Sequence, residues 1–331
     1  MKRLMLKTLA AAVTISAFGV AFAQEKTIKF TTQNPKGHPL VMGMEKFAEI
    51  VQAKSGGKIK VNLFPGGVLG GDAPVVSALQ GGTIEMASMN SGILASQVKD
   101  FEVYDFPFMF ASSKEADAVV DGPFGKKMHA KLEPKGLVGL TYWELGFRQI
   151  TNSKRPINKV EDAEGLKLRV IPNAINVDWV KALGANPTPL AFPEVYAALE
   201  QKAIDGQENP MTVIAANKFF EVQKYATLTN HQYNPQSVLI SKKFWDTLSA
   251  DEKKIISDAA VESTAYQRQQ ARAQANTALE AVKKGGMQVN ELAPAELAKF
   301  REKMKPVVDK HGAAIAETVK ELQAELAKAR Q

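Results

Sequence analysis

One segment near the C-terminus constrains the fold more than any other feature, because residues 250–284 contain neither glycine nor proline. Ser249 and Glu252 have the spacing of a capping box, and two glycines end the segment. A helix of this length would extend for about 52 Å, at about 1.5 Å per residue. Its middle, residues 264–277, is polar and rich in alanine. We therefore predict one helix that crosses two lobes, with two helices separated by an unmarked break as the alternative.

The chain before this helix alternates short strands with amphipathic helices in two successive series. The first predicts strands at 26–33, 58–64 and 84–89 with helices at 39–55 and 72–79, and the second predicts strands at 166–171 and 204–209 with helices at 174–183 and 194–202. Such alternation favours a mainly parallel sheet covered by helices. A chain of 331 residues is near the practical limit of a single core. We therefore predict the α/β class with two lobes and a ligand site between them.

The first 23 residues differ from the rest of the chain. Lys2, Arg3 and Lys7 precede an apolar stretch that ends in the motif Ala-Phe-Ala. A basic start, an apolar core and this cleavage motif are typical of a secretory signal peptide. The apolar stretch is shorter than the roughly 20 residues of a membrane-spanning helix, which disfavours an anchor. We expect cleavage after Ala23 and a soluble extracytoplasmic protein that begins at Gln24.

Composition excludes several classes of protein. The chain has no cysteine, so disulfides, thiolate nucleophiles and cysteine-ligated metals are absent. The chain has four histidines that lie far apart in the sequence, namely His38, His129, His231 and His311. We therefore expect neither a metal nor a cofactor. The formal net charge of +7 includes three positive residues of the leader, and the other charges are mixed in sign. Without a clustered basic footprint, nucleic-acid or membrane-surface binding is disfavoured.

No motif of catalysis or of phosphate binding stands out. The glycine-rich run at 65–72 follows a strand and precedes a helix, but it lacks the G-x-G-x-x-G spacing, and a turn at the edge of a cleft is the preferred interpretation. An extracytoplasmic enzyme would need an activated nucleophile or a paired acid and base. Neither is visible, because the adjacent acidic residues lie at predicted helix starts, where they interact with the helix dipole.

Two arginines are the candidates for ligand binding. Arg148 follows a predicted strand at 137–145, and Arg169 lies in the strand that opens the second series. An arginine taken alone is usually solvated. Two arginines that face one cleft can instead bind a carboxylate, because a guanidinium group donates two parallel hydrogen bonds. Glu208 and Asn209 lie at the end of another strand, where Asn209 could contact a ligand or cap the turn.

The segment 146–210 resembles the periplasmic solute-binding subunits of TRAP (tripartite ATP-independent periplasmic) transporters, DctP type. The resemblance rests on GFRQITN, RPI, GLKLRV, PN, NPTP, AF-x-EVY-x-AL and AIDGQENP, and it extends more weakly over the whole chain after the leader. It implies a two-lobed, type II-like periplasmic binding protein fold spanned by the long helix. We expect lobe I to comprise residues 24–146 and 235–274, and lobe II residues 147–234 and 275–331.

The resemblance also implies roles for individual residues. Arg169 corresponds to the carboxylate-binding arginine, and Arg148 to a second arginine near the ligand's acid group. The other expected contacts are the polar Asn209 and Asn173, the apolar Phe192 and, from lobe I, Gln33, Asp72, Asn90 and Ser91. In the sialic-acid branch the positions of Asn90 and Ile93 carry an acid and an arginine, so sialic acid is disfavoured.

These features predict a monomeric binding protein that delivers a small organic acid to the small and large integral membrane subunits of a TRAP transporter. One cationic anchor beside neutral polar groups favours a hydroxylated monocarboxylate such as an aldonate or uronate. A C4-dicarboxylate or an aromatic acid is the alternative ligand. A binding protein that presents its ligand to a sensor is the alternative role.

Overall fold

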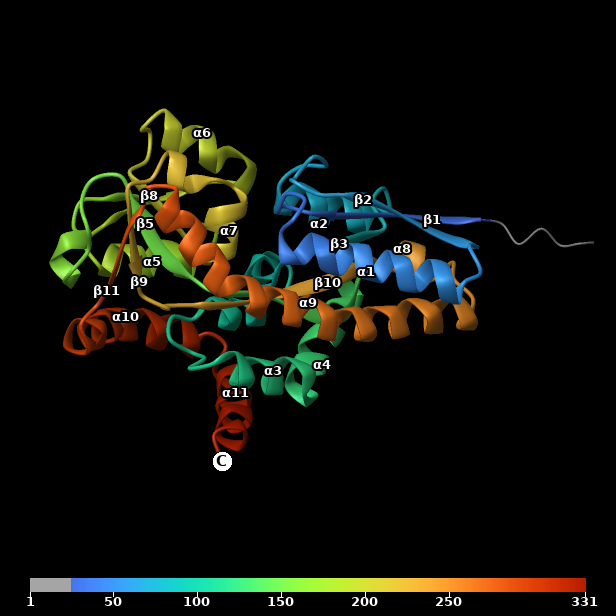
Figure 1. The fold of residues 1–331 in the computed structure, drawn as a ribbon. Helices are drawn as coiled ribbons and strands as arrows, with labels where there is room; N and C mark the ends of the chain where they lie inside the picture. Colours follow the sequence, from blue (N-terminus) through green and yellow to red (C-terminus); the bar gives the residue numbers. More distant parts are fainter. Residues whose placement is uncertain (1–24) are drawn as a thin grey trace, which may run out of the picture.

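The computed structural model describes residues 25–331 (Figure 1), and the predicted signal peptide lies outside the described residues. The strands form two separate sheets. The first sheet has the order β2-β1-β3-β10-β4, with strands β1 (Lys26–Thr32), β2 (Ile59–Phe64), β3 (Met86–Asn90), β4 (Leu137–Phe147) and β10 (Tyr233–Ser241). The second has the order β11-β9-β5-β8-β6-β7, with strands β5 (Gln149–Asn152), β6 (Lys167–Val170), β7 (Asn186–Pro189), β8 (Gly206–Asn209), β9 (Tyr225–Leu228) and β11 (Gln288–Glu291). This mixed α/β architecture with two sheets confirms the predicted fold class.

Helices cover both sheets. Around the first sheet lie α1 (Pro39–Lys54), α2 (Asp72–Gly81), α3 (Ser113–Asp121), α4 (Pro123–Ala130), α8 (Lys242–Trp245) and the 3₁₀ segments η1 (Ser91–Ser96), η2 (Lys99–Asp105) and η3 (Glu133–Lys135). Around the second lie α5 (Ala174–Ala182), α6 (Val195–Glu200), α7 (Met211–Ala216), α10 (Pro294–Ala313), η4 (Val160–Ala163), η5 (Phe192–Glu194) and η6 (Phe219–Glu221). None of these helices, nor any other in residues 25–331, has the length and apolarity that crossing a membrane requires.

The first sheet is parallel on one side and antiparallel on the other. β1 pairs in parallel with β2 and β3, as the first βαβαβ series predicts, whereas β10 runs antiparallel to β3 and β4. Ile28 and Phe30 point from β1 into a core in which the Phe30 and Phe47 rings meet edge to face, 5.6 Å apart. Because parallel strands end at the same edge, the residues that follow β1 and β3 come together there.

A single helix, α9 (Ala250–Lys284), extends along both lobes (Figure 1). Its capping box is formed, since the Ser249 hydroxyl accepts from the Glu252 amide and the Glu252 carboxylate accepts from the Ser249 amide. Ile256 packs in the core of the first lobe and Val282 in that of the second. The prediction of one unbroken helix across two lobes is confirmed.

The polar middle of α9 is fastened to the strand where the chain leaves the first lobe. Buried Gln267 accepts a hydrogen bond from the Glu144 amide at 2.8 Å and donates to the Glu144 carbonyl at 2.8 Å. A side-chain amide there satisfies backbone groups of β4 that no neighbouring strand reaches. The chain enters the second lobe between β4 and β5 and returns at the start of β10.

The last helix, α11 (Ala316–Ala329), differs from the expected division of lobes. Residues 275–331 are expected in lobe II, but Leu322 and Leu326 pack in the core of the first lobe with residues of α3 and α4. Lys127 also pairs with Glu321 at 2.6 Å. The chain turns back after α10, so that the apolar stripe of α11 covers a face of the first lobe. An amphipathic pattern predicts that such a stripe is buried but does not say against which lobe.

Candidate functional site

A cavity lies between the two lobes, where the strands of both sheets end. Its volume of about 40 Å³ is far below the range of about 300–1,000 Å³ for small-molecule sites. The first lobe contributes Thr32, Gln33, Asn34, Asp72, Ser88, Asn90, Leu145 and Gln236. Residues of the second lobe and of the crossing to it are Arg148, Arg169, Ile171, Phe192, Asn209 and Val213.

Arg169 presents most of its guanidinium group to this cavity. The side chain leaves β6 and is only 3% exposed, and its Nε donates to the Leu190 carbonyl at 2.9 Å. Among the described residues, no other hydrogen bond or ion pair engages this guanidinium, so four of its five N–H groups are free. The Cζ of Arg169 lies over the aromatic ring of Phe192, 5.8 Å from the ring centroid. Burial lowers the pKa of Arg169 to about 10, so the group is cationic at neutral pH.

Arg148 also lines the cavity, but its charge is already matched. Its Nε and Nη2 bind both carboxylate oxygens of Glu208, Nη2 also donates to the Glu208 carbonyl, and Nη1 donates to Asn234 Oδ1 at 2.7 Å. Burial acts to raise the pKa of Glu208, but the Arg148 guanidinium outweighs it and holds that pKa at about 2. One Nη1 hydrogen of Arg148 has no partner among the described residues. The two arginines are therefore not equivalent, and Arg169 alone offers an unmatched charge.

Unpaired neutral polar atoms surround this charge. Five buried atoms on the cavity wall have no partner within residues 25–331: Thr32 Oγ1, Gln33 Oε1, Asn34 Oδ1, Ser88 Oγ and Gln236 Nε2. Buried polar atoms are ordinarily hydrogen-bonded, because leaving one unpaired costs about 1–3 kcal/mol. Amides and hydroxyls can both donate and accept, as the hydroxyl groups of a ligand require. The first lobe therefore offers a surface suited to alcohol groups.

Asp72, at the start of α2, is the acidic group of this surface. Burial raises its pKa to about 6, and the opposing charge of Arg169 and a hydrogen bond with Gln33 limit the rise. Above pH 6 the cavity thus holds one unmatched cation and one carboxylate. No group of three or more His, Asp or Glu side chains in the described part of the chain could hold a metal ion.

Seven of the nine side chains expected at the site line the cavity, and Ser91 and Asn173 do not. The Ser91 hydroxyl turns away to the Ser237 hydroxyl, 2.8 Å distant. Asn173 is the N-cap of α5, where its oxygen accepts from the Asn176 amide while its nitrogen donates to Asp105. Both side chains therefore bond to protein groups in this structure and not to the cavity. A cap and a strand-end contact have the same residue type and spacing, so only the surroundings distinguish them.

Sequence reasoning missed four polar residues of the wall: Thr32, Asn34, Ser88 and Gln236. Ser88 could have been found, because it lies two residues before Asn90 on β3 and therefore on the same face. Gln236 could not, since it reaches the cavity only because β10 pairs antiparallel with β3 and places it opposite Asn90.

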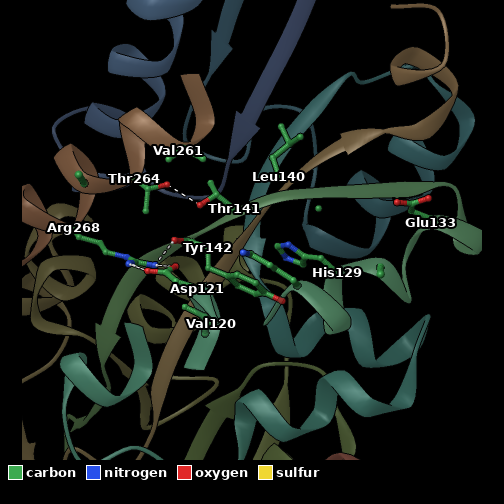
Figure 2. Close-up of a pocket in the computed structure, with 14 residues that line it drawn as sticks. Val120, Asp121, His129, Glu133, Leu140, Thr141, Tyr142, Val261, Thr264 and Arg268 are labelled. Carbon is green, nitrogen blue, oxygen red and sulfur yellow. Dashed lines mark hydrogen bonds and ion pairs between the residues drawn. The ribbon is translucent and has the colours of Figure 1, made fainter. Parts of the chain in front are cut away.

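A larger hollow on the first lobe contains none of the expected site residues (Figure 2). It lies between α9, α4 and β4, and its arginine and histidine are engaged locally. Arg268 binds both carboxylate oxygens of Asp121, at 2.6 and 2.8 Å, and the His129 ring stacks on Tyr142 at 3.8 Å. The cavity between the lobes, in which polar groups from both lobes are free, is the candidate ligand site.

The family model for bacterial extracellular solute-binding protein, family 7 (DctP), matches residues 30–314. The chain belongs to this DctP family. It is 35% identical over 313 residues to the C4-dicarboxylate-binding periplasmic protein DctP of Rhodobacter capsulatus, covering 94% of each chain. Members of the family are transport proteins that bind solutes, which confirms the prediction of a binding protein rather than an enzyme.

Solved structures of TRAP periplasmic solute-binding proteins share the fold. The sugar acid binding protein DctPAm from Advenella mimigardefordensis, in complex with galactonate, is 43% identical, with a TM-score of 0.91 over 92% of this chain and 99% of that chain. A TRAP solute-binding protein from Ochrobactrum anthropi, with its C-terminus bound in the ligand-binding pocket, is 56% identical, with a TM-score of 0.82 over 93% and 97%. The predicted membership of the TRAP solute-binding family is confirmed.

Proposed function

We propose that this DctP-family protein captures a hydroxylated monocarboxylate, such as an aldonate or uronate, and delivers it to the membrane subunits of a TRAP transporter. The observation that carries the proposal is the free guanidinium of Arg169, set in a wall of unpaired neutral polar atoms. A guanidinium fork matches a carboxylate, and amides and hydroxyls match alcohol groups. The resemblance to the galactonate-binding protein supports this ligand class.

A C4-dicarboxylate is the second candidate, because the relative from Rhodobacter capsulatus binds that class. The charges of the cavity argue against it. A second carboxylate would find no second free cation among the residues that line the cavity, since Glu208 already matches Arg148. It would also lie in the same small cavity as the Asp72 carboxyl, and like charges placed together repel.

Ligand binding tests the proposal directly. Purified protein that begins at Gln24 should be titrated by calorimetry with galactonate, galacturonate and succinate at pH 7.5. We expect one of the two sugar acids to bind at least tenfold more tightly than succinate. Tighter binding of succinate would refute the ligand class, and binding of none of a wider set of organic acids would refute acid capture itself.

Periplasmic delivery needs a separate test. The basic and apolar leader supports export with cleavage after Ala23. The mature protein from a periplasmic extract should therefore start at Gln24 by N-terminal sequencing. Neighbouring genes for a small and a large integral membrane protein would support transport, whereas a neighbouring receptor gene would favour presentation to a sensor.

A further inference from the structure

A buried carboxylate lies beneath the cavity and bonds to no cation. Asp105, at the end of η2, is fully buried. Its Oδ1 accepts from Asn234 Nδ2 at 3.1 Å, and its Oδ2 accepts from Asn176 Nδ2 at 3.0 Å and from Asn173 Nδ2. Burying a charge without an ion pair is costly, even when amides solvate it. A neutral side chain would avoid that cost.

The three amides come from different parts of the molecule. Asn176 lies on α5 of the second lobe and Asn173 is the N-cap of that helix, whereas Asn234 lies on β10, where the chain returns to the first lobe. A Cβ on Gly92 of η1 would lie 2.1 Å from Asp105 Oδ2, so the backbone leaves space for this carboxylate only because the residue is glycine. The geometry is therefore built around an ionised acid that accepts from both lobes.

Asn234 relays this arrangement to the cavity. Its Oδ1 accepts both from Arg148 Nη1, at 2.7 Å, and from Asn90 Nδ2, at 3.0 Å. Arg148 and Asn90 each line the cavity. An amide presents oxygen on one side and nitrogen on the other, so an acceptor that binds the nitrogen decides which groups the oxygen can hold.

We propose that Asp105 is a positioning residue of the ligand site, which orients Asn234 so that its oxygen holds Arg148 and Asn90 in place. This role rests on the proposed binding of an organic acid between the lobes. Asp105 itself does not line the cavity, but its hydrogen bond with Asn234 connects it to Arg148 and Asn90, which do.

Replacement of Asp105 by asparagine should change the orientation of the Asn234 side chain and not that of the amides at α5. The amides of α5 cannot turn over, since the Asn173 oxygen caps the helix and the Asn176 oxygen accepts from Trp179 Nε1 at 2.8 Å. The new NH₂ group would therefore face Asn234, and Asn234 would have to turn its own NH₂ toward the Arg148 guanidinium. Two donors would then meet where a donor and an acceptor meet now.

The matched control is Glu102→Gln. Glu102 lies on the same 3₁₀ segment and is also buried, and its replacement by glutamine also removes an acidic group. Its carboxylate Oε1 lies 2.8 Å from His311 Nδ1 and does not contact Asn234. With galactonate as the calorimetric probe at pH 7.5, Asp105→Asn should bind about ten- to a hundredfold more weakly than wild type. Glu102→Gln should stay within twofold. Equal affinities for the two variants, both folded, would overturn the proposal.

A pH titration gives a readout that requires neither a substitution at Asp105 nor a ligand. Burial raises the pKa of Asp105 to about 6, opposed by its amide donor Asn173 and by the charge of Arg148. The other charged groups near this relay are Glu208, whose pKa is about 2, and His231, whose pKa burial lowers. Asp72, on the cavity wall, also titrates near pH 6, so the measurement belongs in an Asp72→Asn background.

In that background, the side-chain amide signals of Asn234 in ¹⁵N NMR should shift between pH 7.5 and 5 with the midpoint of the Asp105 carboxyl. Asn234 signals that stay constant through this titration would overturn the positioning role, even if Asp105→Asn fails to fold. Failure of the wild type to bind any acid would refute the proposed function instead, and the titration would still decide whether Asp105 orients Asn234.

Discussion

Replacement of Arg169 by alanine is the sharpest test of the candidate site. Four of its N–H groups are free and the side chain is almost completely buried, so a bound carboxylate would exchange water for this one cation. Without it, the carboxylate would be desolvated and unpaired, at a cost of about 2–5 kcal/mol. That cost corresponds to roughly thirty- to several-thousand-fold weaker binding. Arg148 cannot substitute, because Glu208 already matches its charge.

The series should include Arg169→Lys and a matched control, Arg155→Ala. The lysine keeps the charge but loses the fork, so we expect it to recover only part of the affinity. Arg155 is an exposed arginine of the same lobe that contacts only the backbone carbonyls of Asp162 and Glu164, and its removal should leave affinity unchanged. Calorimetry with the tightest acid found for the wild type gives the ranking, and thermal unfolding reports whether each variant is folded. Folded Arg169→Ala that binds within threefold of wild type would place the carboxylate anchor elsewhere.

Three further substitutions test other parts of the argument. A Cβ on Gly67 would lie 2.8 Å from Gln33 Oε1 of the cavity wall and 3.1 Å from Pro193 Cγ of the facing lobe, whereas one on Gly66 would meet nothing within 4 Å, and both glycines have positive φ. Gly67→Ala should therefore weaken binding about fivefold or more relative to Gly66→Ala, and calorimetric equality of the two would contradict this tight packing of Gly67 against Gln33 and the facing lobe. Asp72→Asn should raise the affinity for succinate relative to galactonate about tenfold at pH 7.5, because it removes a like charge, and an unchanged ratio would count against charge selection. Glu208→Gln leaves a buried guanidinium unpaired and should cost about 3–5 kcal/mol in urea unfolding at pH 7. The lowered pKa of Glu208 also means that its ionised form stabilises the folded protein: this stabilisation is complete above about pH 4.5 and is lost as the pH falls towards 2. A Glu208→Gln variant as stable as wild type at pH 7 would contradict a stabilising ion pair.

The sequence alone predicted the elements that local chemistry decides. The α9 helix follows from a capping box, a run without helix breakers and a terminal glycine pair, all of which act within one or two turns. The parallel part of the first sheet follows from the alternation of strands and helices. The position of Arg169 at the cavity follows likewise, because parallel strands end at one edge and the residues there face any ligand.

Only the tertiary structure decided which polar groups are free. Arg148 and Arg169 look alike in the sequence, but Glu208 pairs with one and not with the other. Asn173 and Asn209 also look alike in the sequence. Asn173 caps α5 and donates to Asp105, whereas Asn209 lines the cavity. The physical reason is that hydrogen bonds of these side chains depend on partners up to about 150 residues away in the chain, as for Asn90 and Asn234. A local pattern determines which groups can bind, and long-range packing determines which of them still have a bond to give.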